Sequence, residues 1–337
     1  MDLSNLSLVT QPKVDSEWLR SDYWGALKVR SSIGRNKYQV KPGLYKLGTP
    51  GKDAEVIVTS NYKLSFDLVR KSLKGLNAWI LVLQTHGINV WCAAGKGTFG
   101  TDELVRQIND SQLNLYVSHK HIIVPQLGAP GVSGFKVKEA TGFSVKFGPV
   151  RAEDLKDYLA AGLKKNRTMR SVQFNFKDRL VLTPVELVNS LRYFLYALLF
   201  IALISGIHGN GYSLSAVWKN GGSSGVFLLL AYLSGAFFGP VLLPLLPFRH
   251  FGGKGFIMGI LLFGLVVLLV GREYSLLYLI GWFFISGAIS SFLTMNFTGA
   301  STYTSLSGVR KEMRLFVPIQ VASSLAGLTL VILSQLN

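Results

Sequence analysis

The chain of 337 residues contains 49% hydrophobic and 16% charged residues and carries a formal net charge of +17 at pH 7. This length is sufficient for two domains of ordinary size. The single cysteine excludes an intramolecular disulfide and a structural zinc site of the Cys₄ or Cys₃His type.

Charge and hydropathy divide the chain near residue 190. Residues 1–189 have a net charge of +11 and are typical of a soluble domain, whereas the remainder consists of long apolar runs with a net charge of +6. We find no DNA- or RNA-binding motif, and positive charge also suits a domain tethered beside an anionic leaflet. We therefore expect a membrane protein without a nucleic-acid partner. The N-terminus lacks a basic segment followed by an apolar stretch, so we predict no signal peptide and a cytoplasmic first domain.

Residues 1–54 show no regular pattern and are expected to pack on the soluble domain as a lead-in. Residues 55–165 alternate between strand and helix patterns, which predicts a Rossmann-like α/β domain with a parallel sheet. Ser65 is the expected N-cap of its first helix. The predicted strands cover 55–59, 78–83, 122–124 and 143–147, and the predicted helices cover 65–73, 89–97, 101–108 and 153–161.

In a parallel sheet, ligands bind among the loops at the carboxyl ends of the strands. The loops at 59–65, 84–100 and 125–134 should meet at this edge. No G-x-G-x-x-G sequence follows the first strand and no Walker A sequence is present, so we expect neither a nicotinamide nor an ATP site. Ordinary turn chemistry explains the loop residues as well as ligand binding does. The candidate ligand contacts are Thr59, Ser60, Ser65, Gly97, Thr98, Gln126, Gly128 and Ala129.

The only cysteine, Cys92, lies in the stretch "NVWCAAGK" (89–96), which predicts a short helix with Asn89 as its N-cap. Helical spacing places Asn89, Cys92, Ala93 and Lys96 on one face, where small residues leave the surface bare. A lone cysteine is more often a buried small hydrophobe. A first-turn position favours the thiolate, however, so we expect an exposed thiolate facing a broad, flat ligand.

Three neighbouring features are less informative. Gly95 or Gly97 should end the helix, and Trp91 is expected to pack beneath it more than to touch the ligand. His119 and His121 would share one face of a strand, but without a third ligand nearby we expect solvent-facing side chains and no metal.

The second half of the chain predicts an all-α transmembrane domain (187–337) after a basic linker (166–186). Its first helix should begin at the capping box Thr183-Pro184-Val185-Glu186. Basic loop residues predict that the C-terminus lies outside. The five predicted spans, near the length of about 20 residues that a bilayer requires, are 188–207, 225–246, 255–271, 275–295 and 315–334.

The predicted spans contain no ionisable residue except Arg192, which argues against a transporter and favours an anchor or docking surface. Small residues at helical spacing predict close contacts between helices. These are Gly235 with Gly239, Gly255 with Gly259, and Ser286-Gly287 with Ser290-Ser291.

The stretch "NVWCAAGKGTFGTDELV" (89–105) resembles the cap-helix motif of the corrinoid proteins of microbial mercury methylation, the HgcA family. The stretches "VTSNYKLSFD", "PQLGAPGV" and "GFSVKFGPVRAEDL" resemble the cobalamin-binding domain of that family. That domain is in turn similar to the cobalamin domain of corrinoid iron–sulfur proteins of the acetyl-CoA pathway. The resemblance covers residues 40–165 closely, and the five spans match the family's layout.

This resemblance implies a cobalamin cofactor in the methylated, base-off form, with Cys92 as the lower axial ligand of cobalt. The methyl group, ultimately from a methyltetrahydrofolate source, would pass to Hg(II) at the inner membrane and give methylmercury. Asn89, Trp91, Ala93 and Lys96 would join the loop residues named above as cofactor contacts. An Asp-x-His-x-x-Gly motif is absent, so His86 is not expected to ligate the cobalt.

The resemblance also implies a partner, a ferredoxin-like protein of the HgcB type with two 4Fe–4S clusters. It would reduce the cobalt and present Hg(II), because the only thiol of this chain would already be on cobalt. Two alternatives stay open. The chain could carry methyl groups to a different acceptor, or it could be a membrane transport or sensory protein whose soluble domain binds a regulatory cofactor.

Overall fold

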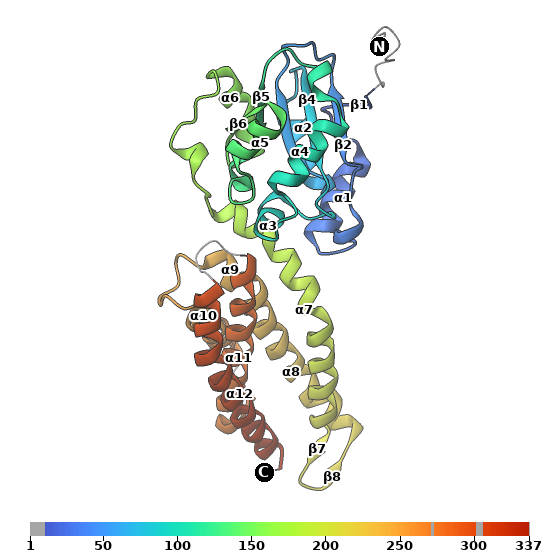
Figure 1. Ribbon diagram of the computed structural model, residues 1–337. Coiled ribbons are helices and arrows are strands. Elements are labelled where there is room, and N and C mark those ends of the chain that lie inside the picture. Colours follow the sequence, from blue (N-terminus) through green and yellow to red (C-terminus); the bar gives the residue numbers. More distant parts are fainter. Residues whose placement is uncertain (1–10, 271–272, 301–305, 337) are drawn as a thin grey trace. The chain divides into compact units, whose positions relative to one another are not determined.

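The computed structural model describes residues 11–270, 273–300 and 306–336. The chain divides into two units, one formed mainly by residues up to Val172 and the other mainly by residues from Gln173 onward. The first is a mixed α/β domain and the second is a bundle of apolar helices, as the sequence predicts (Figure 1).

The α/β unit is built on a six-stranded sheet with the order β1-β2-β4-β3-β5-β6. The strands from β3 to β6 are mutually parallel, which confirms the Rossmann-like expectation for this part of the sheet. Strand β2 runs antiparallel to β4, so the sheet is mixed. The strands are β1 (Lys13–Val14), β2 (Gly43–Leu47), β3 (Val56–Ser60), β4 (Ala78–Leu83), β5 (His121–Val124) and β6 (Ser144–Phe147).

Helices cover both faces of this sheet because both faces of the central strands are apolar. Val58 and Leu81 face a core that also contains residues of α3, α4 and α5. Ile57 and Ile80 face a second core with residues of α2 and α6. The helices are α1 (Arg20–Arg30), α2 (Lys63–Ser72), α3 (Val90–Gly95), α4 (Thr101–Asp110), α5 (Gly134–Thr141) and α6 (Leu155–Ala160). Short 3₁₀ helices lie at Arg35–Lys37, Leu113–Leu115, Gln126–Gly128, Ala152–Asp154 and Thr168–Arg170.

Three details of this unit differ from the predictions. The described part of the lead-in is regular, since it forms β1, α1 and β2. Helix α5 was not predicted. Ser65 is not the N-cap of α2, because the helix begins at Lys63, whose N–H donates to Tyr38 O at 3.0 Å. A backbone acceptor from outside the helix thus takes the place of a capping side chain.

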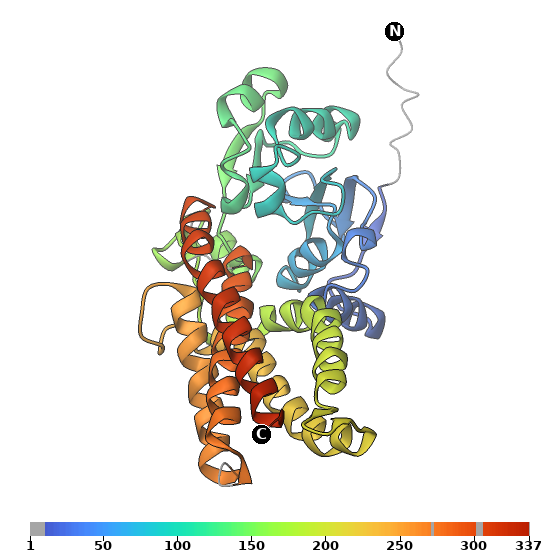
Figure 2. The ribbon, with the colours of Figure 1, turned by 90° about the horizontal axis from the view of Figure 1, so that it is seen from below.

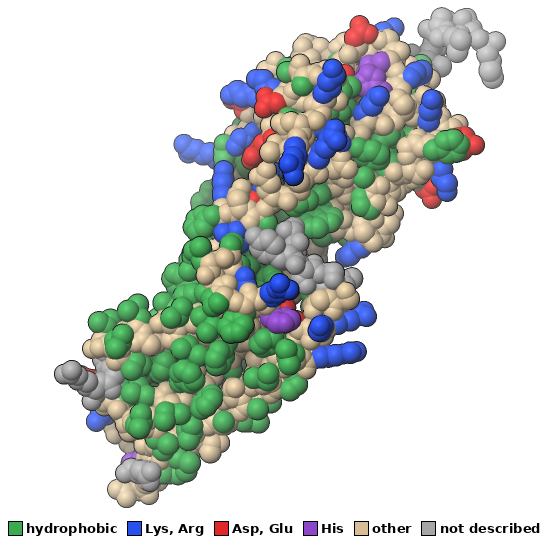
Figure 3. Space-filling view, turned by 90° about the vertical axis from the view of Figure 1, so that its left-hand side faces the viewer, with side chains coloured by type: hydrophobic (Ala, Val, Ile, Leu, Met, Phe, Trp, Pro, Cys, Tyr) green, Lys and Arg blue, Asp and Glu red, His purple; other side chains and the backbone are tan. Residues whose placement is uncertain are grey.

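Among its described residues, the second unit contains five helical segments long and apolar enough to cross a membrane. In Figures 1 and 2, α10, α11 and α12 run side by side, and α11 also packs against α8. Hydrophobic side chains cover most of the visible face of this unit in Figure 3. The helices are α7 (Phe176–Ile204), α8 (Leu214–Leu233) continued by a π-helix (Ser234–Phe238) and α9 (Gly239–Leu242), α10 (Phe251–Val270), α11 (Leu276–Asn296) and α12 (Leu306–Leu336). A short hairpin joins α7 to α8 through β7 (Ile207–His208) and β8 (Gly211–Tyr212).

The predicted start of the first span is wrong. Helix α7 begins two turns earlier, where Asn175 and Asp178 form the capping box, and Pro184 lies inside the helix. A proline cannot donate to the carbonyl four residues before it. The hydroxyl of Thr183 donates to this carbonyl, Leu180 O, at 2.9 Å, which explains how the helix continues through the proline.

The predicted small-residue contacts are confirmed. A Cβ atom on Gly255 would lie 2.6 Å from Ser290 O, and one on Gly259 would lie 2.6 Å from Ser286 O. The hydroxyl of Ser290 donates to Gly255 O at 2.6 Å. Helices α10 and α11 therefore approach each other more closely than larger side chains would allow.

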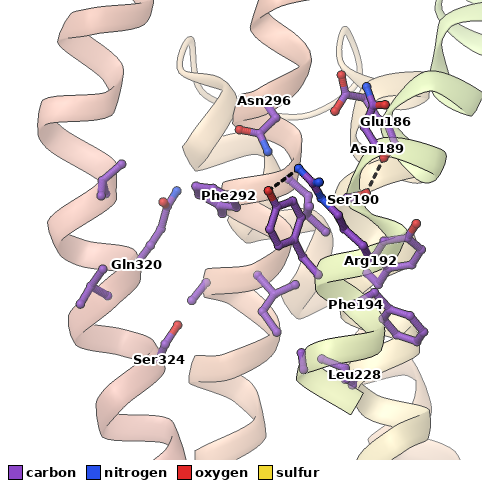
Figure 4. A pocket seen from close by; sticks show the side chains of 18 of the residues that line it. Glu186, Asn189, Ser190, Arg192, Phe194, Leu228, Phe292, Asn296, Gln320 and Ser324 are labelled. Carbon is purple, nitrogen blue, oxygen red and sulfur yellow. Dashed lines mark hydrogen bonds between the residues drawn. The ribbon is translucent and has the colours of Figure 1, made fainter. Parts of the chain in front are cut away.

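A cavity of about 1220 Å³ lies among α7, α8, α11 and α12 (Figure 4). Glu186, Arg192 and Gln320 contribute polar groups to its largely apolar wall. Arg192 donates to the Tyr193 hydroxyl at 2.7 Å. Because α7 starts early, the helix also contains Glu186, which precedes the predicted span 188–207.

Candidate functional site

The carboxyl ends of β3 and β5 form the topological switch point of the sheet. From β3 the chain crosses to β4 on one side and then to β5 on the other. Doubly wound sheets bind ligands in the crevice at such a point. A cavity of about 350 Å³ lies here, and its lining includes Thr59 near the end of β3 and Pro125 after β5. The topology therefore identifies one edge of the domain as the candidate site.

Helix α3 lies beside this cavity and carries the only cysteine. The side chain of Asn89 accepts a hydrogen bond from the Cys92 N–H at 2.9 Å, which confirms Asn89 as the N-cap. Cys92 is exposed. The exposed face consists of Trp91, Cys92, Gly95 and Lys96. At Gly95 this face carries no side chain, so the backbone beside the thiol is open to a flat ligand.

Two predictions about α3 are wrong. Ala93 does not share the exposed face, because its side chain is fully buried in the core under the helix. Its carbonyl is also occupied, since it accepts from the N–H groups of Thr98 and Phe99. Trp91 does not pack beneath the helix, because it is 46% exposed and lines the cavity.

The loop after β5 supports α3 through close backbone contacts that require glycine. A Cβ atom on Gly131 would lie 2.2 Å from Phe99 O, and one on Gly128 would lie 2.5 Å from the Phe99 ring. Gly97, with φ +80°, ends the helix in the left-handed conformation. The glycines of "PQLGAPGV" thus hold the loop against the end of the cap helix.

Asn61, which follows β3, fixes the loop that leads into α3. Its buried amide oxygen accepts hydrogen bonds from the N–H and the hydroxyl of Thr85 and from the N–H of Gly87, at 2.9 to 3.1 Å. Its amide nitrogen donates to Gln84 Oε1 at 2.7 Å. One side chain therefore joins the carboxyl ends of β3 and β4 and sets the position from which the cap helix starts.

A buried ionic cluster holds α2, whose residues line the cavity, against α1. Lys63 lies 2.6 Å from both Asp22 and Asp67, and Arg70 lies 2.7 Å from Asp22 and 2.8 Å from Asp67. Burial alone would raise the pKa of Asp22, but hydrogen bonds from Lys63, the Leu19 N–H and Arg70 lower it to about 2. The same pairs raise the pKa of Lys63 and Arg70 against the effect of burial, which lowers it. Asp22, Lys63 and Arg70 are therefore charged at neutral pH.

The predicted site residues fall into two groups. The cavity lining includes Thr59, Ser65, Asn89 and Trp91, and Cys92 and Lys96 are exposed on the same helix. The others do not line the cavity: Ser60 and Gly128 are buried, and the Gln126 side chain accepts from Lys165 at 2.5 Å. Ala93, Gly97, Thr98 and Ala129 are also outside the lining. The Ser60 hydroxyl is buried and has no hydrogen-bond partner among the residues that the structure describes.

Other residues of the site were missed. Pro149, Val150 and Arg151 line the cavity from the loop after β6. A usable signal existed, because this loop follows a predicted strand and should reach the same edge of the sheet. Asn61 gave no such signal, since its role depends on partners 22 to 26 residues away.

His119 and His121 meet Glu55 at the opposite edge of the sheet. Their ligand atoms lie within 4.8 Å of one another. The His121 Nε2 lies 2.8 Å from Glu55 Oε2, and the His119 Nε2 lies 3.0 Å from Ala54 O. The histidines are thus partly buried and hydrogen-bonded, which corrects the prediction that they simply face solvent.

Comparison with known proteins identifies relatives of the α/β unit. Residues 28–159 match the model of the CdhD family, described as the CO dehydrogenase/acetyl-CoA synthase delta subunit. Gamma subunits of the acetyl-CoA decarbonylase/synthase complex are also similar over 127 residues. The protein of Archaeoglobus fulgidus is 31% identical, that of Methanopyrus kandleri 30% and that of Methanothermobacter thermautotrophicus 32%.

These alignments cover 37% of this chain but only 27% of each relative. The chain therefore spans about a quarter of the length of the relatives it matches. The matched segment contains the sheet from β2 to β6, the cap helix and the cavity. These matches point to a domain like that of a corrinoid iron–sulfur protein, followed in this chain by helices that could span a membrane.

Proposed function

We propose that this protein is a membrane-anchored, corrinoid-dependent methyltransferase whose methyl acceptor is Hg(II). The observation that supports the corrinoid part is the exposed thiol of Cys92 on a bare helix face beside a cavity at the switch point. This arrangement lies in the segment that is similar to acetyl-CoA decarbonylase/synthase subunits. Mercury as the acceptor rests on the resemblance of the cap-helix sequence to the mercury-methylating family.

The residues present fit a corrinoid. The exposed thiol of Cys92 would bind the cobalt, and the open backbone at Gly95 leaves room for a flat ring. The hydroxyls of Thr59 and Ser65 would bind polar groups of the cofactor tail inside the cavity, and Trp91 would cover an apolar edge. Lys96 would bind an amide or phosphate group at the rim. When bound, the corrinoid would supply a transferable methyl group on its cobalt.

The other predicted site residues would position the cap helix and the loops around the cofactor. Asn89 caps the helix that carries the thiol, and the backbone of Gly97 ends it. Ala93 and Gly128 would support the ring from below through the core and the loop after β5. Four further predicted residues would help to form this edge of the sheet without lining the cavity: Ser60, Thr98, Gln126 and Ala129.

Mercury would have to reach this site already bound to another molecule. Hg(II) prefers thiolate ligands, and the only thiol of this chain would be occupied by cobalt. A ferredoxin-like partner of the HgcB type, with two 4Fe–4S clusters and additional cysteines, would deliver Hg(II) and reduce the cobalt. The methyl group would come from a methyltetrahydrofolate-linked donor.

The test is methyl transfer by the full-length protein in lipid nanodiscs, loaded with methylcobalamin and given thiol-bound Hg(II) and a reductant. We expect methylmercury from the unsubstituted protein and none above background from Cys92→Ala. If the protein retains the corrinoid but never methylates Hg(II), the acceptor is wrong and a methyl carrier for another acceptor is supported. If it retains no corrinoid, the whole proposal fails.

We further propose that the α/β unit is cytoplasmic and that the C-terminus lies outside the inner membrane. Basic residues gather at the starts of α10 and α12, as expected for cytoplasmic helix ends. These residues are Arg249, His250, Lys254, Arg310, Lys311 and Arg314. Alkaline phosphatase fused to the C-terminus should be active, whereas green fluorescent protein at the same place should be dark.

One observation favours transport as a second candidate function. The cavity of about 1220 Å³ places Glu186 and Arg192 among membrane helices, and intramembrane ionisable residues often mark substrate pathways. Flux of an ion or metal into proteoliposomes, lost in Glu186→Gln, would support this function. Methyl transfer without such flux would exclude it.

A further inference from the structure

Helix α1 presents an unusual outer face. Two adjacent rows of side chains run along it. One row is apolar and consists of Tyr23 and Leu27 together with Leu19, the residue directly before the helix. The other row is mixed and consists of Arg20, Trp24 and Lys28. The exposed fractions are 70% for Leu19, 54% for Tyr23, 63% for Trp24 and 53% for Leu27. We call these six residues the α1 face. A surface helix of a soluble domain normally turns its apolar residues inward.

The inner side of α1 shows why the helix is oriented this way. Ala26 and Val29 pack on Tyr62 and Leu64, and Asp22 belongs to the buried ionic cluster with Arg70. Removing one partner of such a buried charge network is strongly destabilising. The orientation of α1 is therefore fixed by charges and core contacts, and the apolar face is held outward.

We propose that the α1 face binds an anionic lipid surface. Tryptophan, tyrosine and leucine with arginine and lysine among them are the composition of helices that lie in the membrane interface. Aromatic rings favour the headgroup level, and long basic side chains extend to lipid phosphates. The chain also contains its own apolar spans, so a lipid surface stays at high effective concentration for the tethered α/β unit.

Charge supports a lipid occupant more than a protein one. The part of the chain before residue 190 has a net charge of +11, which opposes binding to a second copy of itself. The same charge attracts the domain to an anionic leaflet, where each basic residue near the surface contributes about five-fold in binding. This proposal is independent of the corrinoid and of mercury.

The consequence concerns the orientation of the candidate site. The ionic cluster joins α1 to α2 through Asp22, and α2 supplies Ser65 and Leu68 to the cavity lining. Binding of the α1 face to lipid would therefore hold the cavity and cap helix at a constant angle to the membrane surface. A soluble partner would then approach the thiol from a restricted direction.

The test uses the full chain in nanodiscs of phosphatidylcholine with or without phosphatidylglycerol. In a Cys92→Ser background, Trp24→Cys, Leu27→Cys and, as control, Phe135→Cys are labelled with an environment-sensitive fluorophore. Phe135 is an aromatic residue on α5 that is exposed to an even greater extent (77%). Two quenchers are compared, a nitroxide on the lipid tails and iodide in the buffer.

We expect the labels at positions 24 and 27 to be blue-shifted and quenched by the lipid nitroxide when phosphatidylglycerol is present. The label at position 135 should be quenched by iodide alone. Replacing Arg20 and Lys28 by glutamine should reduce quenching by the lipid nitroxide.

Three results would overturn the proposal. Iodide could quench the labels at positions 24 and 135 equally, which would mean that the α1 face does not contact the lipid surface. Both quenchers could be excluded from positions 24 and 27, which means that protein covers the face. Quenching could be the same without phosphatidylglycerol, which contradicts an anionic surface.

Discussion

The amide oxygen of Asn61 accepts two hydrogen bonds from Thr85, one from its N–H at 3.1 Å and one from its hydroxyl at 2.9 Å. The same hydroxyl lies 2.7 Å from Ile88 O, directly before the cap helix, so its one proton is shared between the Asn61 amide oxygen and this carbonyl. The end of the central strand thus determines where the helix with the only thiol begins.

Asn61→Ala should destabilise the α/β unit by about 3 kcal/mol, because the buried N–H groups of Thr85 and Gly87 lose their acceptor. Asn109→Ala, at an exposed position of α4, is the control and should change stability by less than about 0.5 kcal/mol. Urea unfolding followed by tryptophan fluorescence measures both. Equal stability of the two variants would show that the network does not hold the loop.

Asp22→Asn should cost about 2 kcal/mol at pH 7, because the folded-state pKa of Asp22 is about 2 against an ordinary value of 3.8. A carboxyl group whose pKa is lower in the folded state than in the unfolded state stabilises the fold at pH values above its unfolded-state pKa. This contribution is therefore present at neutral pH and is lost as the pH falls from about 4 toward 2. The difference in melting temperature between the two proteins should shrink over that range.

The control for this experiment is Asp110→Asn, which removes an exposed ion pair with Arg106 on α4. Exposed pairs contribute little, so its melting temperature should follow the unsubstituted protein at every pH. A pH-independent difference for Asp22→Asn would contradict the role of the ionised carboxylate.

Gly95→Leu should leave the fold intact but weaken corrinoid binding by at least about ten-fold. A loss of about 1.4 kcal/mol in binding free energy corresponds to a ten-fold lower affinity. A Cβ atom at Gly95 meets nothing within 4 Å, so the side chain is tolerated but covers the face beside Cys92. Gly95→Ala is the control, because its smaller side chain should cause a smaller loss of affinity for the corrinoid. Titration with cobalamin measures the affinity, and unchanged binding by the leucine variant would mean that the ring lies elsewhere.

Gly255→Val should destabilise the helical unit by about 2 kcal/mol, because its Cβ would clash with Ser290 O and Thr294 on α11. Gly264→Val on the same helix is the matched control, since nothing lies within 4 Å of that position. Thermal unfolding in detergent compares the two. Similar melting temperatures would contradict tight packing of α10 on α11.

Features with local signals were predictable from the sequence. The strand 78–83 was predicted with its observed bounds, the cap of α3 by Asn89 was predicted, and all five apolar helices were found. Each depends on periodicity, hydropathy or a capping residue within a few positions.

The errors have physical causes. Helix α1 was missed because apolar residues lie on both its outer side (Trp24 and Leu27) and its inner side (Ala26 and Val29), which weakens the helical periodicity. The start of α7 was misplaced because Thr183-x-x-Glu186 has the same capping signature as Asn175-x-x-Asp178. The burial of Ala93 could not be predicted, since a short helix of small residues does not indicate which face meets the core.

The most direct test of the central claim is the UV-visible spectrum of the full-length protein reconstituted with cobalamin, compared with Cys92→Ala. We predict a cobalt–thiolate spectrum that disappears in the variant while the fold is retained. An identical spectrum in both proteins, or no bound corrinoid in either, would contradict the assignment of Cys92 as the cobalt ligand.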